Sequence, residues 1–176
     1  MVFSGSGIDV VWGGVFSLLL ATACVYDIRY RRIPNVLVAI LLGAGLLHAV
    51  FSLDTARALG LSVAGAGLGF AIWIPFYLVG AIGAGDVKLF AAAAAWLGPS
   101  LTWRAALIAA LVGGLLAIFF LLRERRLGTA LQRIALIVPT QTLGVLKAPA
   151  GSRHAALPYG VALAVGAGVA AWFPWW

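Results

Sequence analysis

Long apolar runs, separated by short stretches that hold the polar residues, glycines and prolines, dominate the pattern along this chain. Six runs approach or reach the roughly 17–25 residues that a helix needs to cross a bilayer. They lie at 10–26, 34–52, 58–80, 85–99, 103–122 and 156–174. Between them there is no soluble domain and no long polar linker. The pattern predicts one all-α domain over residues 1–176, a bundle of about six transmembrane helices.

Composition supports a membrane protein. Apolar residues make up 64% of the chain and charged residues only 10%, with a mean hydropathy of +1.09. Soluble domains average about 45–50% apolar and about 25% charged residues. We therefore expect an integral membrane protein whose main partner is the lipid bilayer.

The basic residues are distributed unevenly between the two sides of the predicted bundle. Ten fall in connections on one side: Arg29, Arg31, Arg32, Lys88, Arg123, Arg125, Arg126, Arg133, Lys147 and Arg153. Only Arg57 and Arg104 fall on the other. The positive-inside rule places the ten in the cytoplasm and both termini outside. Because topology explains the net charge of +7, nucleic-acid binding is not predicted.

The segment 123–155 is the longest connection and is predicted to be cytoplasmic. Its apolar residues are interrupted by Arg133 and Pro139, so it lacks a full spanning run. Two interpretations stay open. The segment either lies flat on the inner leaflet, with basic groups facing anionic headgroups, or is an irregular basic loop.

Two aspartates interrupt apolar sequence, in "VYDIRYRRIPN" and in "GAIGAGDVKLF". A carboxylate at the centre of a membrane helix costs about 2.5–3.5 kcal/mol, and a position near a helix end lowers that cost. Asp27 closes the first predicted span and Asp86 opens the fourth. By the predicted topology both ends are cytoplasmic, so the two carboxyls can meet at one depth although 59 positions separate them.

A close pair of carboxyls tends to share one proton, because like charges at short distance cannot both ionise comfortably. The ionised member can take a proton from water while the protonated member polarises a carbonyl, which is general acid–base peptide hydrolysis. We therefore predict Asp27 and Asp86 as the catalytic pair. One cysteine and no cluster of histidines leave no predicted metal site or cofactor.

Three neighbours of Asp86 are predicted to shape the site or bind substrate. Gly83 and Gly85 permit close backbone approach beside an extended peptide. Two interpretations of Lys88 stay open. It extends its ammonium group to the inner headgroups, or it has, in addition, a role in the site, binding an acidic substrate group or biasing the carboxyl pair. Asn35 and Tyr159, near the same interface, are read as structural.

The motifs "DIRYRRIPN" and "GAGDVKL", together with "LPYGVALAVGA" at 157–167, resemble those of the type IV prepilin leader peptidases. These are membrane aspartic proteases of the GxGD type, and Asp27 and Asp86 match their catalytic pair. The cysteine tetrad of the larger members is absent, so the chain is most similar to the compact form found with Flp-type, or tight-adherence, pilus systems. The resemblance implies peptidase activity rather than N-methylation.

The resemblance further implies a bacterial inner membrane location and a pilin-like precursor as substrate. Such precursors carry a short basic leader, cut after a glycine, before an apolar helix with a glutamate near its start. Two other functions remain alternatives: a small proton-coupled transporter using both aspartates, and a non-catalytic assembly subunit of a secretion or pilus system. The particular pilin and the oligomeric state are not indicated by the sequence.

Overall fold

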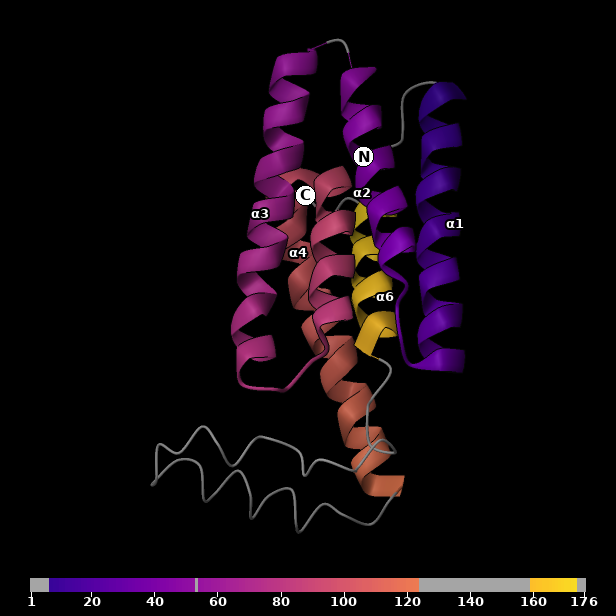
Figure 1. Ribbon diagram of the computed structural model, residues 1–176, viewed down its shortest axis with the longest axis vertical. Coiled ribbons are helices and arrows are strands. Elements are labelled where there is room, and N and C mark those ends of the chain that lie inside the picture. The colour runs from indigo at the N-terminus through magenta and orange to yellow at the C-terminus, as the bar shows by residue number, and fades with distance from the viewer. Residues whose placement is uncertain (1–6, 53, 124–158, 174–176) are drawn as a thin grey trace.

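The computed structural model describes residues 7–52, 54–123 and 159–173, and this part of the chain is all-helical. Five apolar helices form a bundle (Figure 1). They are α1 (Gly7–Tyr30), α2 (Asn35–Val50), α3 (Thr55–Leu78), α4 (Ala84–Arg123) and α6 (Tyr159–Trp172). For these residues the predicted all-helical fold is confirmed.

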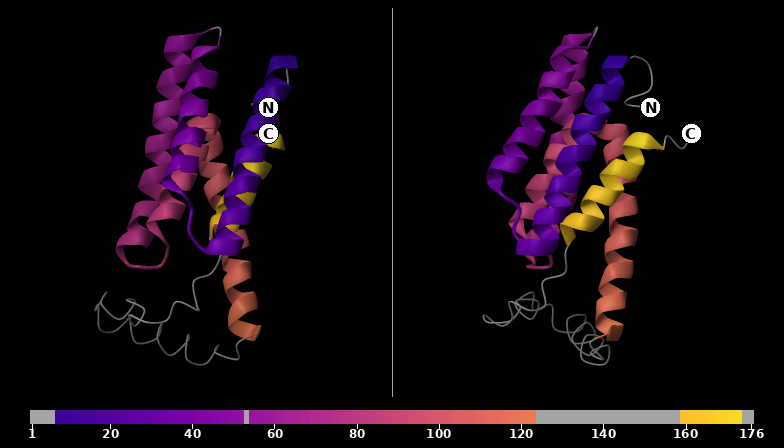
Figure 2. Two further views of the ribbon diagram at one scale, coloured as in Figure 1. Left: turned by 45° about the vertical axis from the view of Figure 1, so that its right-hand side comes forward. Right: turned by 90° about the vertical axis from the view of Figure 1, so that its right-hand side faces the viewer.

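Helix α4 contains a break that turns it into a hairpin. Gly98 has non-helical angles, φ +67° and ψ 171°, and Pro99 follows it. Tyr159 packs on Gly113 and also interacts electrostatically with Asp86. Since these two partners lie 15 residues after and 12 residues before Gly98, the two arms must run antiparallel (Figure 2).

The sequence predicted separate runs at 85–99 and 103–122, with an interruption at 100–102. In the structure the chain is helical through 100–102, and the break lies earlier, at Gly98. Glycine adopts positive φ at little cost, and Pro99 is tolerated in the first turn of the second arm. The Thr102 hydroxyl donates to the Gly98 carbonyl at 2.7 Å and helps to secure this turn.

Three of the described helical segments are long and apolar enough to cross a membrane, namely Asp9–Tyr30, Thr55–Leu78 and Ala84–Phe119. Helices α2 and α6 are apolar but shorter. The structure thus supports a membrane protein, while the count of six crossings stays a prediction. Apart from Arg123, the predicted loop 123–155 lies outside the described residues.

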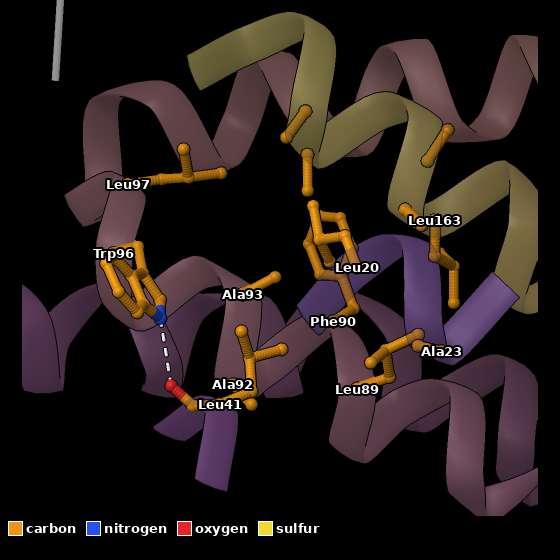
Figure 3. Close-up of a cluster of buried hydrophobic side chains, with 14 of the residues drawn as sticks. Leu20, Ala23, Leu41, Leu89, Phe90, Ala92, Ala93, Trp96, Leu97 and Leu163 are labelled. Carbon is orange, nitrogen blue, oxygen red and sulfur yellow. Dashed lines mark hydrogen bonds between the residues drawn. The ribbon is translucent and has the colours of Figure 1, made fainter. Parts of the chain in front are cut away.

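The first arm of α4 forms the centre of the bundle. Its alanines 92–95 are buried, and the backbone of Gly65 in α3 lies against Ala94 and Gly98. On the α2 side, the Trp96 indole N–H donates to the Leu41 carbonyl at 2.8 Å (Figure 3). Small side chains let helix backbones approach closely, which supplies much of the packing energy between membrane helices.

Both helix ends that carry the candidate aspartates lie at one end of the bundle. The last turn of α1 and the first turns of α2, α4 and α6 meet there (Figures 1 and 2). Arg29 lies in the last turn of α1 at this end and Arg31 and Arg32 follow it, whereas Arg57 and Arg104 belong to the opposite end. Among the described residues, these arginines are thus more frequent at the end that carries the aspartates.

Candidate active site

Asp27 lies in the last turn of α1, where the chain leaves the helix. The Arg31 amide donates to the Asp27 carbonyl at 2.9 Å, and Arg31 adopts the left-handed region with φ +51°. This is an αL helix ending, which glycine usually occupies. The side chain of Asp27 is only 6% exposed.

Asp86 lies in the first turn of α4 and caps it. The Gly83 amide donates to Asp86 Oδ2 at 3.2 Å, while the Gly83 carbonyl accepts from the Asp86 amide at 3.1 Å. This reach from the third helical residue back to the N-cap amide is half of a capping box. A Cβ at Gly83 would lie 3.2 Å from the same carboxylate oxygen, so glycine allows this close approach. Asp86 remains partly exposed.

The structure brings the two aspartates together. The Asp27 and Asp86 carboxyls lie close enough to interact electrostatically, although α1 and α4 are separated in sequence by two helices. Ile33 lies against a glycine beside each aspartate. Its Cβ is 3.5 Å from the Cβ position of Gly85, which precedes Asp86, and its Cδ1 is 3.1 Å from that of Gly160, which approaches Asp27. The pair thus joins a buried carboxyl to a partly exposed one.

The two remaining candidates face different surroundings. Gly85 turns toward Ile33, so a small residue here leaves room for that side chain. Lys88 is exposed, and its Nζ lies 3.4 Å from Asn35 Oδ1 at the start of α2. The ammonium group therefore sits at the rim of the site with a neutral neighbour.

Sequence reasoning missed the contribution of α6 to this site. The backbone N–H groups of Gly160 and Val161 approach the Asp27 carboxyl, and Tyr159 interacts electrostatically with Asp86. Asp27 Oδ2 itself is buried and receives no hydrogen bond of good geometry from any described residue. The "LPYG" stretch was a visible signal, but only the packing of α6 shows which carboxyl its glycine meets.

This arrangement has the parts needed for acid–base chemistry on a peptide bond. Two neighbouring carboxyls lie at helix ends, one buried and one partly exposed. In the described ranges, no group of three or more His, Cys, Asp and Glu side chains gathers as a metal site would require.

Comparison with known proteins identifies one family. The model of the Type IV leader peptidase family matches residues 14–120, which include Asp27 and Asp86. No curated protein and no solved structure matches the chain.

Proposed function

Because the chain belongs to the Type IV leader peptidase family, we propose that it is an intramembrane aspartic endopeptidase acting on pilin-like precursors. It removes the basic leader at the cytoplasmic face of the bacterial inner membrane. Asp27 and Asp86 activate the water that cuts the peptide bond. No cofactor takes part in this proposal.

One observation carries the proposal: Asp27 and Asp86 interact electrostatically at one end of the bundle. Helix caps alone do not require this meeting, because a cap such as Asp54 on α3 works with its own helix only. Paired carboxyls in a protein of low polarity are costly, so their presence points to a function.

The proposed reaction is a general acid–base hydrolysis. The ionised carboxyl takes a proton from water, and the water oxygen attacks the carbonyl carbon of the scissile bond. The protonated carboxyl donates a hydrogen bond to the carbonyl oxygen as negative charge develops there. The C–N bond then breaks, and the leaving nitrogen receives the proton that the base had taken.

The surroundings of the pair suit a peptide that enters from the basic end of the bundle. An extended substrate exposes unpaired backbone groups, which a membrane tolerates only inside protein or beside a wet cavity. Gly83 keeps a side chain away from the Asp86 carboxyl, and Gly85 faces Ile33. Lys88, at the rim, is proposed to bind the acidic group of the precursor near the cut.

The test uses the purified full-length chain in detergent and a precursor with a basic leader, a glycine at the cut and an apolar helix. We expect the parent to release the leader and Asp27→Asn or Asp86→Asn to fail. Asp54→Asn, which alters a carboxyl at the other end of the bundle, should cleave normally. A folded parent that cuts no such precursor would refute the proposal.

The same preparation distinguishes the alternatives. A proton-coupled transporter in vesicles would show aspartate-dependent proton movement without leader release. An assembly subunit would bind partners equally well with either Asp→Asn change. Leader release that depends on both carboxyls is expected of the peptidase alone.

A further inference from the structure

We propose that the N-terminus of α6 gives the two aspartates unequal roles, holding Asp27 as the ionised base and leaving Asp86 as the acid. The inference rests on the proposed peptidase function. Its new element, α6, lies outside the residues matched by the family model.

Asp27 faces the N-terminal end of α6. The first N–H groups of a helix have no partner within it, and the helix dipole adds positive potential there. In α6 the N–H groups of Gly160 and Val161, the second and third residues, lie near the Asp27 carboxyl. Both effects favour a carboxylate over a carboxylic acid.

The Asp27 carboxyl also lies very close to the backbone of Gly160. A Cβ at Gly160 would lie 2.8 Å from Asp27 Oδ2 and 3.0 Å from its Cγ. It would also lie 3.1 Å from Ile33 Cδ1, so the carboxyl and Ile33 together close the space. A side chain at position 160 would therefore separate the Asp27 carboxyl from the N-terminus of α6, whichever of the two moves.

The donors and charges around Asp86 differ from those around Asp27. Asp86 accepts from one backbone N–H, that of Gly83, and faces the Asp27 charge as well as the Tyr159 phenol. Asp27 faces two N–H groups and the positive charge of Arg31; among the described residues, its other titratable neighbours are Asp86 and the Cys24 thiol on its own helix. When the pair holds one proton, the two N–H groups and Arg31 favour its residence on Asp86, and they must outweigh the burial of Asp27.

The orphaned oxygen fits the role of base. Asp27 Oδ2 is buried, in a side chain 94% removed from solvent, and receives no hydrogen bond of good geometry from any described residue. Once water enters the site, this acceptor, which has no other donor to satisfy among the described residues, takes the proton of the attacking water. Asp86, partly exposed beside it, supplies the O–H for the substrate carbonyl.

The kinetic test compares Gly160→Ala with Gly168→Ala on the same helix, where an added Cβ meets nothing within 4 Å. Displacing a catalytic group by about 1 Å can cost roughly 10²-fold in rate. We expect Gly160→Ala to lower kcat by about that factor with KM nearly unchanged, and to move the acidic limb of the rate profile to higher pH. Gly168→Ala should match the parent; parental kcat and an unmoved pH profile in a folded Gly160→Ala would overturn the proposal.

An infrared titration tests the role assignment without any cleavage assay, so it separates this proposal from the proposed function. Asp86→Asn leaves Asp27 alone in the site, and Asp27→Asn leaves Asp86 alone. The other carboxyl side chains, Asp9, Asp54 and Glu124, are common to both variants. We expect the carboxylic-acid band of the lone Asp27 to disappear at lower pH than that of the lone Asp86.

Adding Gly160→Ala to the Asp86→Asn variant should raise the pH at which the Asp27 band disappears, whereas adding Gly168→Ala should not. If Gly160→Ala fails to fold, the order of the two lone carboxyls still decides the matter. Equal midpoints or the reverse order would overturn the proposal, even for a chain that cleaves its precursor.

Discussion

Asp86 has two duties in this account, capping α4 and taking part in chemistry, and two substitutions separate them. Asp86→Asn keeps a side-chain oxygen that can accept from the Gly83 amide, whose bond to the carboxylate is 3.2 Å long. Asp86→Ala removes that acceptor as well as the ionisable group. The two variants should therefore differ in stability but not in their loss of activity.

The magnitudes make the two duties distinguishable. Loss of a capping side chain costs about 0.5–2 kcal/mol of stability, typically about 1. Loss of a general acid or base costs about 10²–10⁴-fold in rate, which is about 2.7–5.4 kcal/mol at 1.36 kcal/mol per tenfold. The chemical effect should thus exceed the capping effect in both variants.

The assay pairs initial rates of precursor cleavage with denaturant-induced unfolding in the same detergent. Asp54 provides a matched control, because it caps α3 by accepting from the Arg57 amide at the same 3.2 Å but at the opposite end of the bundle. Asp54→Ala should lose about 1 kcal/mol of stability and keep the parental rate. Asp86→Asn should lose at least about 10²-fold in rate with stability nearly unchanged.

Asp86→Asn that cleaves at the parental rate would refute the chemical role. An Asp86→Ala variant whose lost activity returned when its stability was restored by a tighter-packing substitution elsewhere would also refute it. In that case capping would account for Asp86 entirely.

Three further predictions concern packing and the rim of the site. Gly65→Ala should destabilise the bundle by about 1–3 kcal/mol through overpacking, because its Cβ would meet the first arm of α4. Gly67→Ala, whose Cβ faces open space, should not destabilise it. Equal unfolding curves for the two variants would contradict this. Trp96→Phe should cost about 1 kcal/mol in the same measurement, because the Leu41 carbonyl loses its donor, and a neutral effect would contradict the importance of that bond. Lys88→Met should raise KM for a precursor with its acidic residue near the cut and leave KM unchanged for one in which that residue is neutral; the same KM as the parent for both would remove the binding role.

The helical elements could be predicted largely from the apolar pattern, because lipid requires both apolar side chains and satisfied backbone groups. The predicted runs 10–26, 34–52 and 58–80 each overlap one described helix. Their ends were less predictable, since polar residues such as Asp27 and Arg29 are tolerated in a final turn. The predicted interruption at 100–102 lay after the actual break at Gly98, because sequence alone does not show which small residue adopts positive φ.

The site could be predicted in part. Charge in apolar sequence is costly enough to draw attention to Asp27 and Asp86, and helix counting placed both at one end. The contact of Asp27 with Gly160 could not be predicted, because it depends on how α6 packs against α1 across more than 130 residues of sequence. Glycines are common in this chain, and only three-dimensional proximity distinguishes Gly160 from Gly168.

The central claim is that Asp27 and Asp86 act as one unit, and a double-mutant cycle on precursor cleavage tests it most directly. Rates are measured for the parent, Asp27→Asn, Asp86→Asn and the double variant. Each single change is expected to lower the rate at least about 10²-fold. The double variant should be about as slow as the slower single, since residues acting as a unit are strongly non-additive. A single variant with the parental rate, or single losses that multiply in the double variant, would contradict the claim.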